Sequence, residues 1–332
     1  MTAEVALRRP PAPPSWPRRL VCVSVNAAID KIATVDRLRP GQIHRPDLLS
    51  VVPGGKALNV ARAAARLGMP VRALAVLGGH AGDWMETALR VRGIETRAVR
   101  IAGETRTCLS VFDADTGMLT EFYEPGLTID AGGWALVEEA LGAELEDDPS
   151  GALVVLAGSL PPGAPGDAYA RLVLQSTSAG ARSVVDADRP ALAVALEARP
   201  WMVKVNAHEA AAVTGLRGAG EAAALAAARA IAELTGGAVV VTRGLDGAIV
   251  REDSGASWRI GGPPERGRYP VGSGDSLLAG LAVGLASGFS LPEAARRGSA
   301  VGAANALVPG QGELDPADAD RMLRAVILAR IG

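Results

Sequence analysis

The chain has 332 residues, of which 48% are hydrophobic and 21% are charged, and its formal net charge is −2. A chain of this length buries a full core as one large α/β domain or two ordinary ones, without disulfides or metals. The near-neutral charge argues against nucleic acid as a partner, and no uncharged apolar run of about 18 residues predicts a membrane span.

The two cysteines and the first residues bear on compartment and domain limits. Cys22 and Cys108 both fall in apolar, strand-like segments, which favours buried thiols in a reducing compartment, so we expect a cytoplasmic protein. Residues 1–18 carry arginines among prolines but lack the apolar stretch of about 7 to 15 residues that a secretory signal contains. We expect residues 1–18 to be a disordered leader and residues 19–332 to be the folded domain.

Strand, turn and helix then alternate along the chain. The short, valine-rich run at 20–28 predicts a buried strand, a glycine-rich turn at 53–56 leads into helical spacing over 57–68, and the apolar run 71–78 predicts the next strand. Such alternation predicts a three-layer α/β fold, in which helices cover both faces of a doubly wound, mostly parallel sheet. Further strands, each followed by a helix-like stretch, are expected at 151–158, 181–188, 201–206 and 237–244.

Two stretches break this alternation. Residues 30–52 and 98–124 contain shorter β-like runs joined by turns such as Asp115-Thr116-Gly117. We expect them to form a small antiparallel sheet that projects from the main body as a lid.

The segment PVGSGDS (270–276) is the best candidate for catalysis. Gly272, Ser273 and Gly274 open an apolar helix whose first turn contains Asp275. Backbone N–H groups at a helix N-terminus hold a phosphate or a developing oxyanion, and a carboxylate beside them is placed to accept a proton from an attacking hydroxyl. The alternative is that Asp275 only caps its helix.

A second glycine turn, PGGKALN (53–59), places Gly54, Gly55, Lys56 and Asn59 at the mouth of a helix. Backbone amides and a lysine suit a sugar hydroxyl or an anionic phosphate. Taken alone, such a turn is more often ordinary loop structure.

The segments KVNAHEA (204–210) and VTRGLDGA (241–248) each follow a predicted strand, at the sheet edge where α/β proteins bind ligands. Asn206 and Glu209 are placed to hold Mg²⁺ through its waters, or else to form a helix N-cap and its capping-box partner. None of the three histidines has zinc-like spacing, and the chain has neither a G-x-G-x-x-G fingerprint nor a G-x-x-x-x-G-K-[ST] loop.

Taken together and in this order, the segments resemble the ribokinase-like superfamily of sugar kinases, also called the phosphofructokinase B family, over about residues 20–330. NAAID (26–30), GETRTC (103–108) and AGSLPPG (157–163) add to the motifs above, and the set is similar to the branch of 1-phosphofructokinases and tagatose-6-phosphate kinases. The resemblance implies Mg²⁺-assisted phosphoryl transfer from ATP to a hydroxyl of a ketohexose monophosphate. Fructose 1-phosphate and tagatose 6-phosphate are the favoured acceptors, and the product is a bisphosphate.

The resemblance also implies a role for each matched residue. Asp275 is implied as the catalytic base, with Gly272, Ser273 and Gly274 holding the transferring phosphoryl group, and the lid is implied to pair across a homodimer. Implied substrate contacts are Asp30, Gly54, Gly55, Asn59 and Ser159, with Arg106 and Lys56 on the phosphate that the sugar already carries. Implied nucleotide contacts are Lys204, Asn206, Glu209, Thr242, Gly244, Gly247 and, at the adenine end, Asn305; no protein group ligates Mg²⁺ directly.

Three alternatives stay open. The acceptor is instead fructose 6-phosphate, or an unphosphorylated sugar or nucleoside; members that use fructose 6-phosphate can carry an arginine near the position of Glu121, so an acidic residue there weakens that choice. A non-catalytic sensor of sugar phosphate or nucleotide would be expected to lose the carboxylate of Asp275, which is present. A nicotinamide-dependent oxidoreductase would need the fingerprint that the chain lacks.

Overall fold

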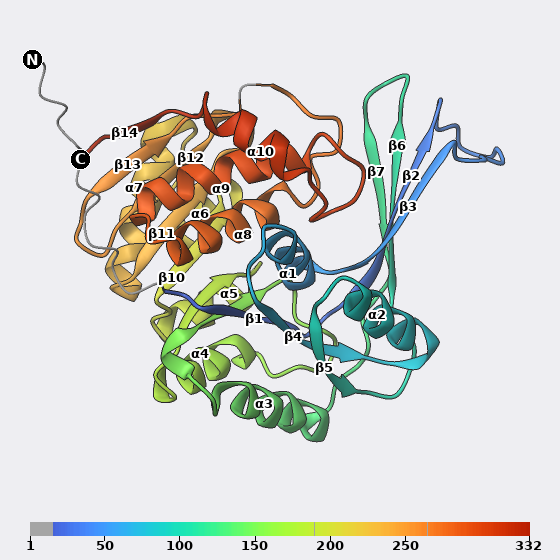
Figure 1. Cartoon of the computed structure of the whole chain (residues 1–332), viewed down its shortest axis with the longest axis horizontal. Helices are drawn as coiled ribbons and strands as arrows, with labels where there is room; N and C mark the ends of the chain where they lie inside the picture. The colour runs from blue at the N-terminus through green and yellow to red at the C-terminus, as the bar shows by residue number, and fades with distance from the viewer. Residues whose placement is uncertain (1–15, 189, 264) are drawn as a thin grey trace, which may run out of the picture.

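A ten-stranded sheet forms the centre of the molecule (Figure 1). The computed structural model describes residues 16–188, 190–263 and 265–332. The strands lie in the order β14-β13-β12-β11-β10-β9-β8-β1-β4-β5, and neighbours from β11 to β5 pair in parallel while β12, β13 and β14 pair antiparallel. The strands are β1 (Arg19–Ser24), β4 (Val71–Leu77), β5 (Glu95–Arg100), β8 (Ala152–Ala157), β9 (Arg182–Asp186), β10 (Met202–Asn206), β11 (Ala238–Thr242), β12 (Ala248–Arg251), β13 (Ser257–Ile260) and β14 (Leu328–Arg330).

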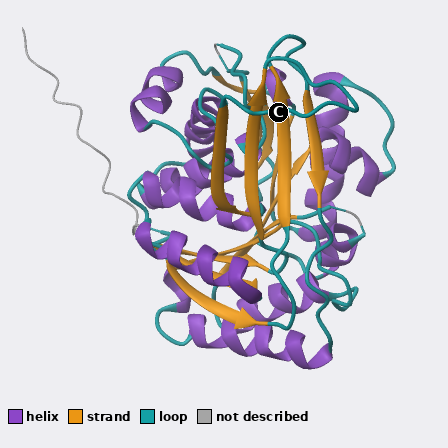
Figure 2. Ribbon diagram, turned by 90° about the vertical axis from the view of Figure 1, so that its right-hand side faces the viewer, coloured by secondary structure: helices purple, strands orange, loops and turns teal. Residues whose placement is uncertain are grey.

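Helices cover both faces of this sheet, as Figure 2 shows. Alternation along β1 explains the two layers, because Leu20 and Cys22 point into one apolar cluster while Val21 and Val23 point into the other. The first cluster takes its helical residues from α1 (Lys56–Arg66), α2 (Gly79–Val91), α8 (Ser273–Ala286), α9 (Leu291–Asn305) and α10 (Pro316–Leu323). The second takes them from α3 (Ala131–Leu145), α4 (Ala168–Ser178), α5 (Ala191–Glu197), α6 (Ala207–Thr214) and α7 (Gly220–Thr235). The predicted three-layer, doubly wound α/β fold is confirmed.

The strand order fixes where a ligand can bind. From β1 the chain passes to β4 and β5 on one side and later returns through β8, β9, β10 and β11 on the other. In open α/β sheets, the crevice at such a reversal, outside the carboxyl ends of the strands, is the usual ligand site.

The lid is a separate four-stranded sheet that projects from the body (Figure 1). Its order is β3-β2-β6-β7, with β2 (Ala28–Val35), β3 (Leu48–Gly54), β6 (Thr107–Asp113) and β7 (Leu119–Tyr123). The expectation of a purely antiparallel lid is wrong at one pair, since β2 and β6 run parallel. Both strands leave the body in the same direction, each as the first strand of its own hairpin. The predicted lid limits also shift, because Glu95–Arg100 forms β5 of the main sheet.

The first described residues pack on the body. The rings of Trp16 and Trp201 meet edge to face at 4.9 Å, and the Arg182 guanidinium lies 4.2 Å from the Trp16 ring centroid. The Arg18 side chain pairs with Asp148. The predicted disordered leader is therefore wrong for residues 16–18, and residues 1–15 lie outside the described residues.

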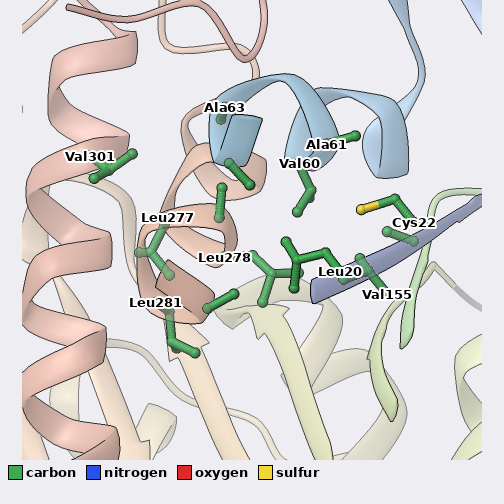
Figure 3. Packing of buried hydrophobic residues seen from close by; sticks show 14 of the residues in the cluster. Leu20, Cys22, Val60, Ala61, Ala63, Val155, Leu277, Leu278, Leu281 and Val301 are labelled. Carbon is green, nitrogen blue, oxygen red and sulfur yellow. The ribbon is translucent and has the colours of Figure 1, made fainter. Parts of the chain in front are cut away.

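Close packing of the helices brings together the two glycine-rich turns that precede α1 and α8. A Cβ at Gly280 would lie 2.6 Å from Val301 Cγ2, and one at Gly298 would lie 2.4 Å from the Leu277 carbonyl oxygen, so glycine lets α8 and α9 approach. Helix α1 packs on α8 above β1 and β8 (Figure 3), through Val60, Ala61, Ala63, Leu277, Leu278, Leu281, Leu20, Cys22 and Val155. Both cysteines are buried free thiols, as expected, and no helix within the described ranges is long and apolar enough to cross a bilayer.

Gly298→Ala is expected to lower the free energy of unfolding by about 1 to 3 kcal/mol, because the added methyl group forces α9 away from the α8 backbone. Denaturant unfolding measures the change. Gly132→Ala is the matched control, because a Cβ at this exposed helical glycine meets nothing closer than 3.5 Å, and it is expected to be neutral or to stabilise by up to about 1 kcal/mol. Equal or greater stability of Gly298→Ala than of the wild type would show that the α8–α9 contact is not tight.

Candidate active site

A cavity of about 750 Å³ lies over the carboxyl ends of β1, β8, β9, β10 and β11, between the main sheet and the lid. Its wall contains residues from every segment that the sequence singled out. The predicted residues that line it are Asp30, Gly55, Lys56, Asn59, Arg106, Ser159, Lys204, Asn206, Glu209, Thr242, Gly244, Gly247, Gly272, Ser273, Gly274 and Asp275. Gly54 and Asn305 do not line it.

Asp275 lies in the first turn of α8, on the cavity wall. Gly272 precedes this helix with φ +82°, a left-handed conformation that favours glycine, and a Cβ there would lie 2.8 Å from Gln311 Cα. The Asp275 carboxylate does not cap the helix. It accepts a hydrogen bond of 2.8 Å from Nδ2 of Asn59 in α1. The alternative prediction, that Asp275 only caps its own helix, is therefore not supported, because the carboxylate is held by another helix.

Burial, followed by the negative charge of Asp186, raises the pKa of Asp275 to about 6. The charges of Lys204 and Lys56 and the hydrogen bond from Asn59 act in the opposite direction. A carboxylate with this pKa is ionised at neutral pH and basic enough to accept a proton from a hydroxyl.

Two lysines meet one buried aspartate beneath this turn. Asp186, with no exposed surface, accepts from Lys204 Nζ at 2.5 Å and from Lys56 Nζ at 3.2 Å. Burial raises the pKa of Asp186, but the two ammonium charges outweigh it and hold the pKa below its usual range. A Cβ at Gly274 would lie 2.8 Å from Lys204 Nζ, so the missing side chain lets this charge reach the turn. The cavity therefore places two lysines, both paired with Asp186, on the wall beside the proposed base.

Sequence reasoning missed Asp186. Its signal was a carboxylate at the carboxyl end of the strand expected over 181–188, where side chains enter the ligand crevice.

The lid supplies the opposite wall. Asp30 on β2 accepts a hydrogen bond of 3.3 Å from the Gly55 amide, and burial raises its pKa to about 7. A Cβ at Gly54 would lie 1.9 Å from Asp30 Oδ2. The implied substrate contact of Gly54 is thus replaced by a steric role, since this glycine leaves room for the Asp30 carboxylate.

Arg106 and Ser159 line the same end of the cavity. The Arg106 guanidinium donates to the Asn26 carbonyl at 3.1 Å and to the Glu124 carbonyl at 3.2 Å, while Asn26 Nδ2 donates to Ser159 Oγ at 3.0 Å. These bonds hold a guanidinium at the cavity edge, where its fork is suited to bind a phosphate.

Asn206 and Glu209 form the capping box that was one of their two predicted roles. Glu209 N donates to Asn206 Oδ1 at 2.8 Å, and Asn206 N donates to Glu209 Oε2 at 2.9 Å. Both residues still line the cavity, and Glu209 Oε1 lies 3.5 Å from Lys56 Nζ. An amide and a carboxylate at this part of the wall suit Mg²⁺ that keeps several of its waters.

The implied adenine contact of Asn305 is not supported. Its side chain has no exposed surface, and Oδ1 accepts from Ser276 Oγ at 2.8 Å and from Gly312 N at 2.7 Å while Nδ2 donates to the Val271 carbonyl at 3.1 Å. Asn305 thus braces the turn before α8 from behind. Other residues in α9 and just after it line the cavity instead: Ser299, Gly302, Ala303 and Ala306.

The family model for pfkB family carbohydrate kinases matches residues 18–318. The chain belongs to this family. A 1-phosphofructokinase of Xanthomonas campestris pv. campestris is 39% identical over 272 residues, which covers 80% of this chain and 83% of the relative. An ATP-dependent 6-phosphofructokinase isozyme 2 of Mycobacterium tuberculosis is 30% identical over 313 residues, covering 93% of this chain and 91% of the relative.

Solved structures agree with this assignment. Phosphofructokinase-2 from Escherichia coli, in complex with substrates and products, superposes with a TM-score of 0.85 at 28% identity, covering 93% of this chain and 99% of that chain. This pfkB kinase is therefore an ATP-dependent carbohydrate kinase. The family assignment argues against the alternatives of a non-catalytic sensor and a nicotinamide-dependent oxidoreductase.

Proposed function

We propose that this pfkB kinase phosphorylates a ketohexose monophosphate, with fructose 1-phosphate as the leading acceptor, tagatose 6-phosphate as the second and a bisphosphate as product. The observation that carries the proposal is the carboxylate of Asp275, held by Asn59 and facing a cavity with cationic groups at both ends. Lys56 and Lys204 mark the end beside the α8 turn, and Arg106 marks the lid end. The relative named 1-phosphofructokinase supports the choice of acceptor.

The proposed step is a direct transfer. The acceptor oxygen bonds to the γ-phosphorus of ATP, the bond from that phosphorus to the β,γ-bridging oxygen breaks, ADP leaves, and the hydroxyl proton passes to Asp275. The first N–H groups of a helix have no acceptor within the helix, so the turn at 272–274 suits the γ-phosphoryl oxygens as their charge redistributes. Lys204 adds positive charge on the same side, and so does Lys56, which pairs with the same Asp186. In this proposal Lys56 serves the transferring phosphoryl group in place of the sugar phosphate that the resemblance implied.

Nucleotide and metal occupy the β10 and β11 end in this proposal. ATP lies across Lys204, Asn206, Thr242, Gly244 and Gly247, all of which line the cavity. Mg²⁺ would be held by the phosphates, with Asn206 and Glu209 contacting its waters, and would supply neutralisation of phosphate charge. Asn305 has no part in this site.

The lid favours a sugar whose phosphate does not lie beneath β7. Glu121 Oε1 accepts a hydrogen bond of 2.5 Å from the hydroxyl of Tyr123, which lines the cavity. A carboxylate beside this wall repels a phosphate placed there. The same feature argues against fructose 6-phosphate, which ranks after tagatose 6-phosphate and is kept as the alternative acceptor because the 30% identical relative is named a 6-phosphofructokinase.

A homodimer through the lid is part of the proposal. The register places Val51, Lys31, Leu109 and Phe122 in one row across the sheet, and Phe122 is 57% exposed. The adjacent row contains Asp30 and Cys108, which face the cavity. This row, with exposed Val51 and Phe122 at its two ends, therefore lies on the outer face of the lid, where a second lid is able to cover it.

Asp275→Asn is expected to lower kcat by at least about 10²-fold, because an amide cannot accept the hydroxyl proton. ADP release with Mg-ATP and fructose 1-phosphate measures the rate. Asp130→Asn is the matched control, since Asp130 also lies at a helix start but caps α3 through the Gly133 amide, away from the cavity. Wild-type kcat in Asp275→Asn would rule out the carboxylate as base.

The acid limb of kcat/KM for the sugar is expected near pH 6. Asp275 must be ionised to act, and its pKa is raised to about 6, so the rate falls about tenfold per unit below that pH. An unperturbed aspartate would keep its activity to about pH 4. Asp30→Asn distinguishes the second carboxylate with a raised pKa, because the limb remains in this variant if Asp275 causes it; a flat profile from pH 7 to pH 5 contradicts the assignment.

Arg106→Gln is expected to raise KM for the phosphorylated acceptor about tenfold or more while leaving KM for ATP within about twofold, because one charge-assisted contact to phosphate is lost. The acceptor panel contains fructose 1-phosphate, tagatose 6-phosphate, fructose 6-phosphate, fructose, ribose and adenosine. Turnover of an unphosphorylated acceptor alone would show that Arg106 has no phosphate to bind. Fastest turnover of fructose 6-phosphate would overturn the inference from Glu121.

A further inference from the structure

A buried arginine, Arg62, donates a hydrogen bond to Asn59, the residue that donates to the carboxylate of Asp275. Arg62 lies one helical turn after Asn59 on α1, does not line the active-site cavity, and has a side chain that is 1% exposed. We propose that Arg62 is a positioning residue for phosphoryl transfer. It holds the Asn59 amide so that Nδ2 faces Asp275, and the other carboxylate oxygen is left for the acceptor hydroxyl; the inference rests on the proposed role of Asp275 as base.

The hydrogen bonds of Arg62 connect the Asn59 amide to Glu313 and to the Gln311 carbonyl. Its Nη2 donates to Asn59 Oδ1 at 2.9 Å and to the Gln311 carbonyl, and its Nη1 donates to Glu313 Oε1 at 2.8 Å. Asn59 Nδ2 in turn donates to Asp275 Oδ2 at 2.8 Å and to Gln311 Oε1 at 3.1 Å. The network runs from Glu313 through Arg62 and Asn59 to the cavity.

This network permits one orientation of the amide. A guanidinium only donates and an ionised carboxylate only accepts. If the Asn59 amide turned over, its NH₂ group would face the Arg62 guanidinium, and its oxygen would face both Asp275 and Gln311 Oε1. Each buried polar group left unpaired costs about 1 to 3 kcal/mol. Loss of Arg62 removes the donor to Oδ1, so the orientation of the amide then depends on the contacts of Nδ2 with Asp275 and Gln311.

The orientation matters for the chemistry of Asp275. Its Oδ2 is taken by Asn59, and Oδ1 has no hydrogen-bond partner in the parts of the chain that the structure describes. Asp275 is 6% exposed and that surface lies in the cavity, so Oδ1 is the oxygen open to a hydroxyl. A donated hydrogen bond also favours the ionised carboxylate, whereas an amide oxygen in the same place would favour the protonated form.

Glu313 fixes the far end of Arg62. Its carboxylate also lies 3.1 Å from Arg66 Nη1 and 3.8 Å from Arg92 Nε, at the surface. The side chain of Arg66 is 53% exposed and bonds Glu313 and the Leu314 carbonyl, so it shares the partner of Arg62, while no hydrogen bond joins it to Asn59 among the described residues. Arg66 is therefore the matched control.

The experiment is a double-mutant cycle on the full-length kinase. Arg62→Gln is expected to lower kcat about tenfold or more, to leave KM for ATP within about twofold, and to move the acid limb of kcat/KM to higher pH. In the Asn59→Ala background the same change is expected to alter kcat by less than about twofold, because Arg62 acts through Asn59. Arg66→Gln is expected to leave both kcat and the limb unchanged.

Thermal unfolding of each variant separates folding from positioning. A purely structural role predicts equal loss of active enzyme in both backgrounds and an unmoved acid limb, and either result overturns the proposal. If Arg62→Gln does not fold, Arg62→Lys is measured in the same cycle; a lysine keeps one donor for Asn59, so a smaller fall in kcat with the same dependence on Asn59 is expected. Activity of Asp275→Asn would refute the base itself, whatever the cycle shows.

Discussion

The hydrogen bond from Asn59 to Asp275 is the constraint on which the site depends. It joins two helices across 216 positions of sequence, and it exists only because α1 packs on α8 over β1 and β8 (Figure 3). Glycines at the start of α8 and between α8 and α9 let the backbones approach. A carboxylate in such a place is desolvated, which accounts for its raised pKa.

Charge balance inside the cavity follows from that burial. A buried carboxylate near a second carboxylate needs compensation, and Asp186 receives it from Lys56 and Lys204. These lysines lie on the side of the cavity where the turn before α8 presents backbone amides. The wall that neutralises Asp186 is therefore also the wall suited to transferring phosphate.

The lid adds specificity through its two faces. Because side chains alternate along a strand, one row of residues closes the cavity with Asp30 and Cys108 while the next row faces away from it. Tyr123, at the end of β7, brings Glu121 to the edge of the cavity. The lid residues proposed to contact the acceptor thus lie on a sheet that contributes little to the main core.

Sequence patterns alone predicted the alternation of strands and helices, the mostly parallel sheet and the existence of a lid, while the family resemblance implied most residues of the cavity wall. Periodicity and glycine turns are local signals, and ligand sites in this fold lie at the ends of strands that local patterns reveal. Only the tertiary structure decided the roles of Gly54, Asp186, Arg62 and Asn305, the parallel pairing of β2 with β6, and the packing of residues 16–18. Whether a polar side chain faces a ligand or braces a turn depends on which distant helix packs against it, and no short segment of sequence contains that information.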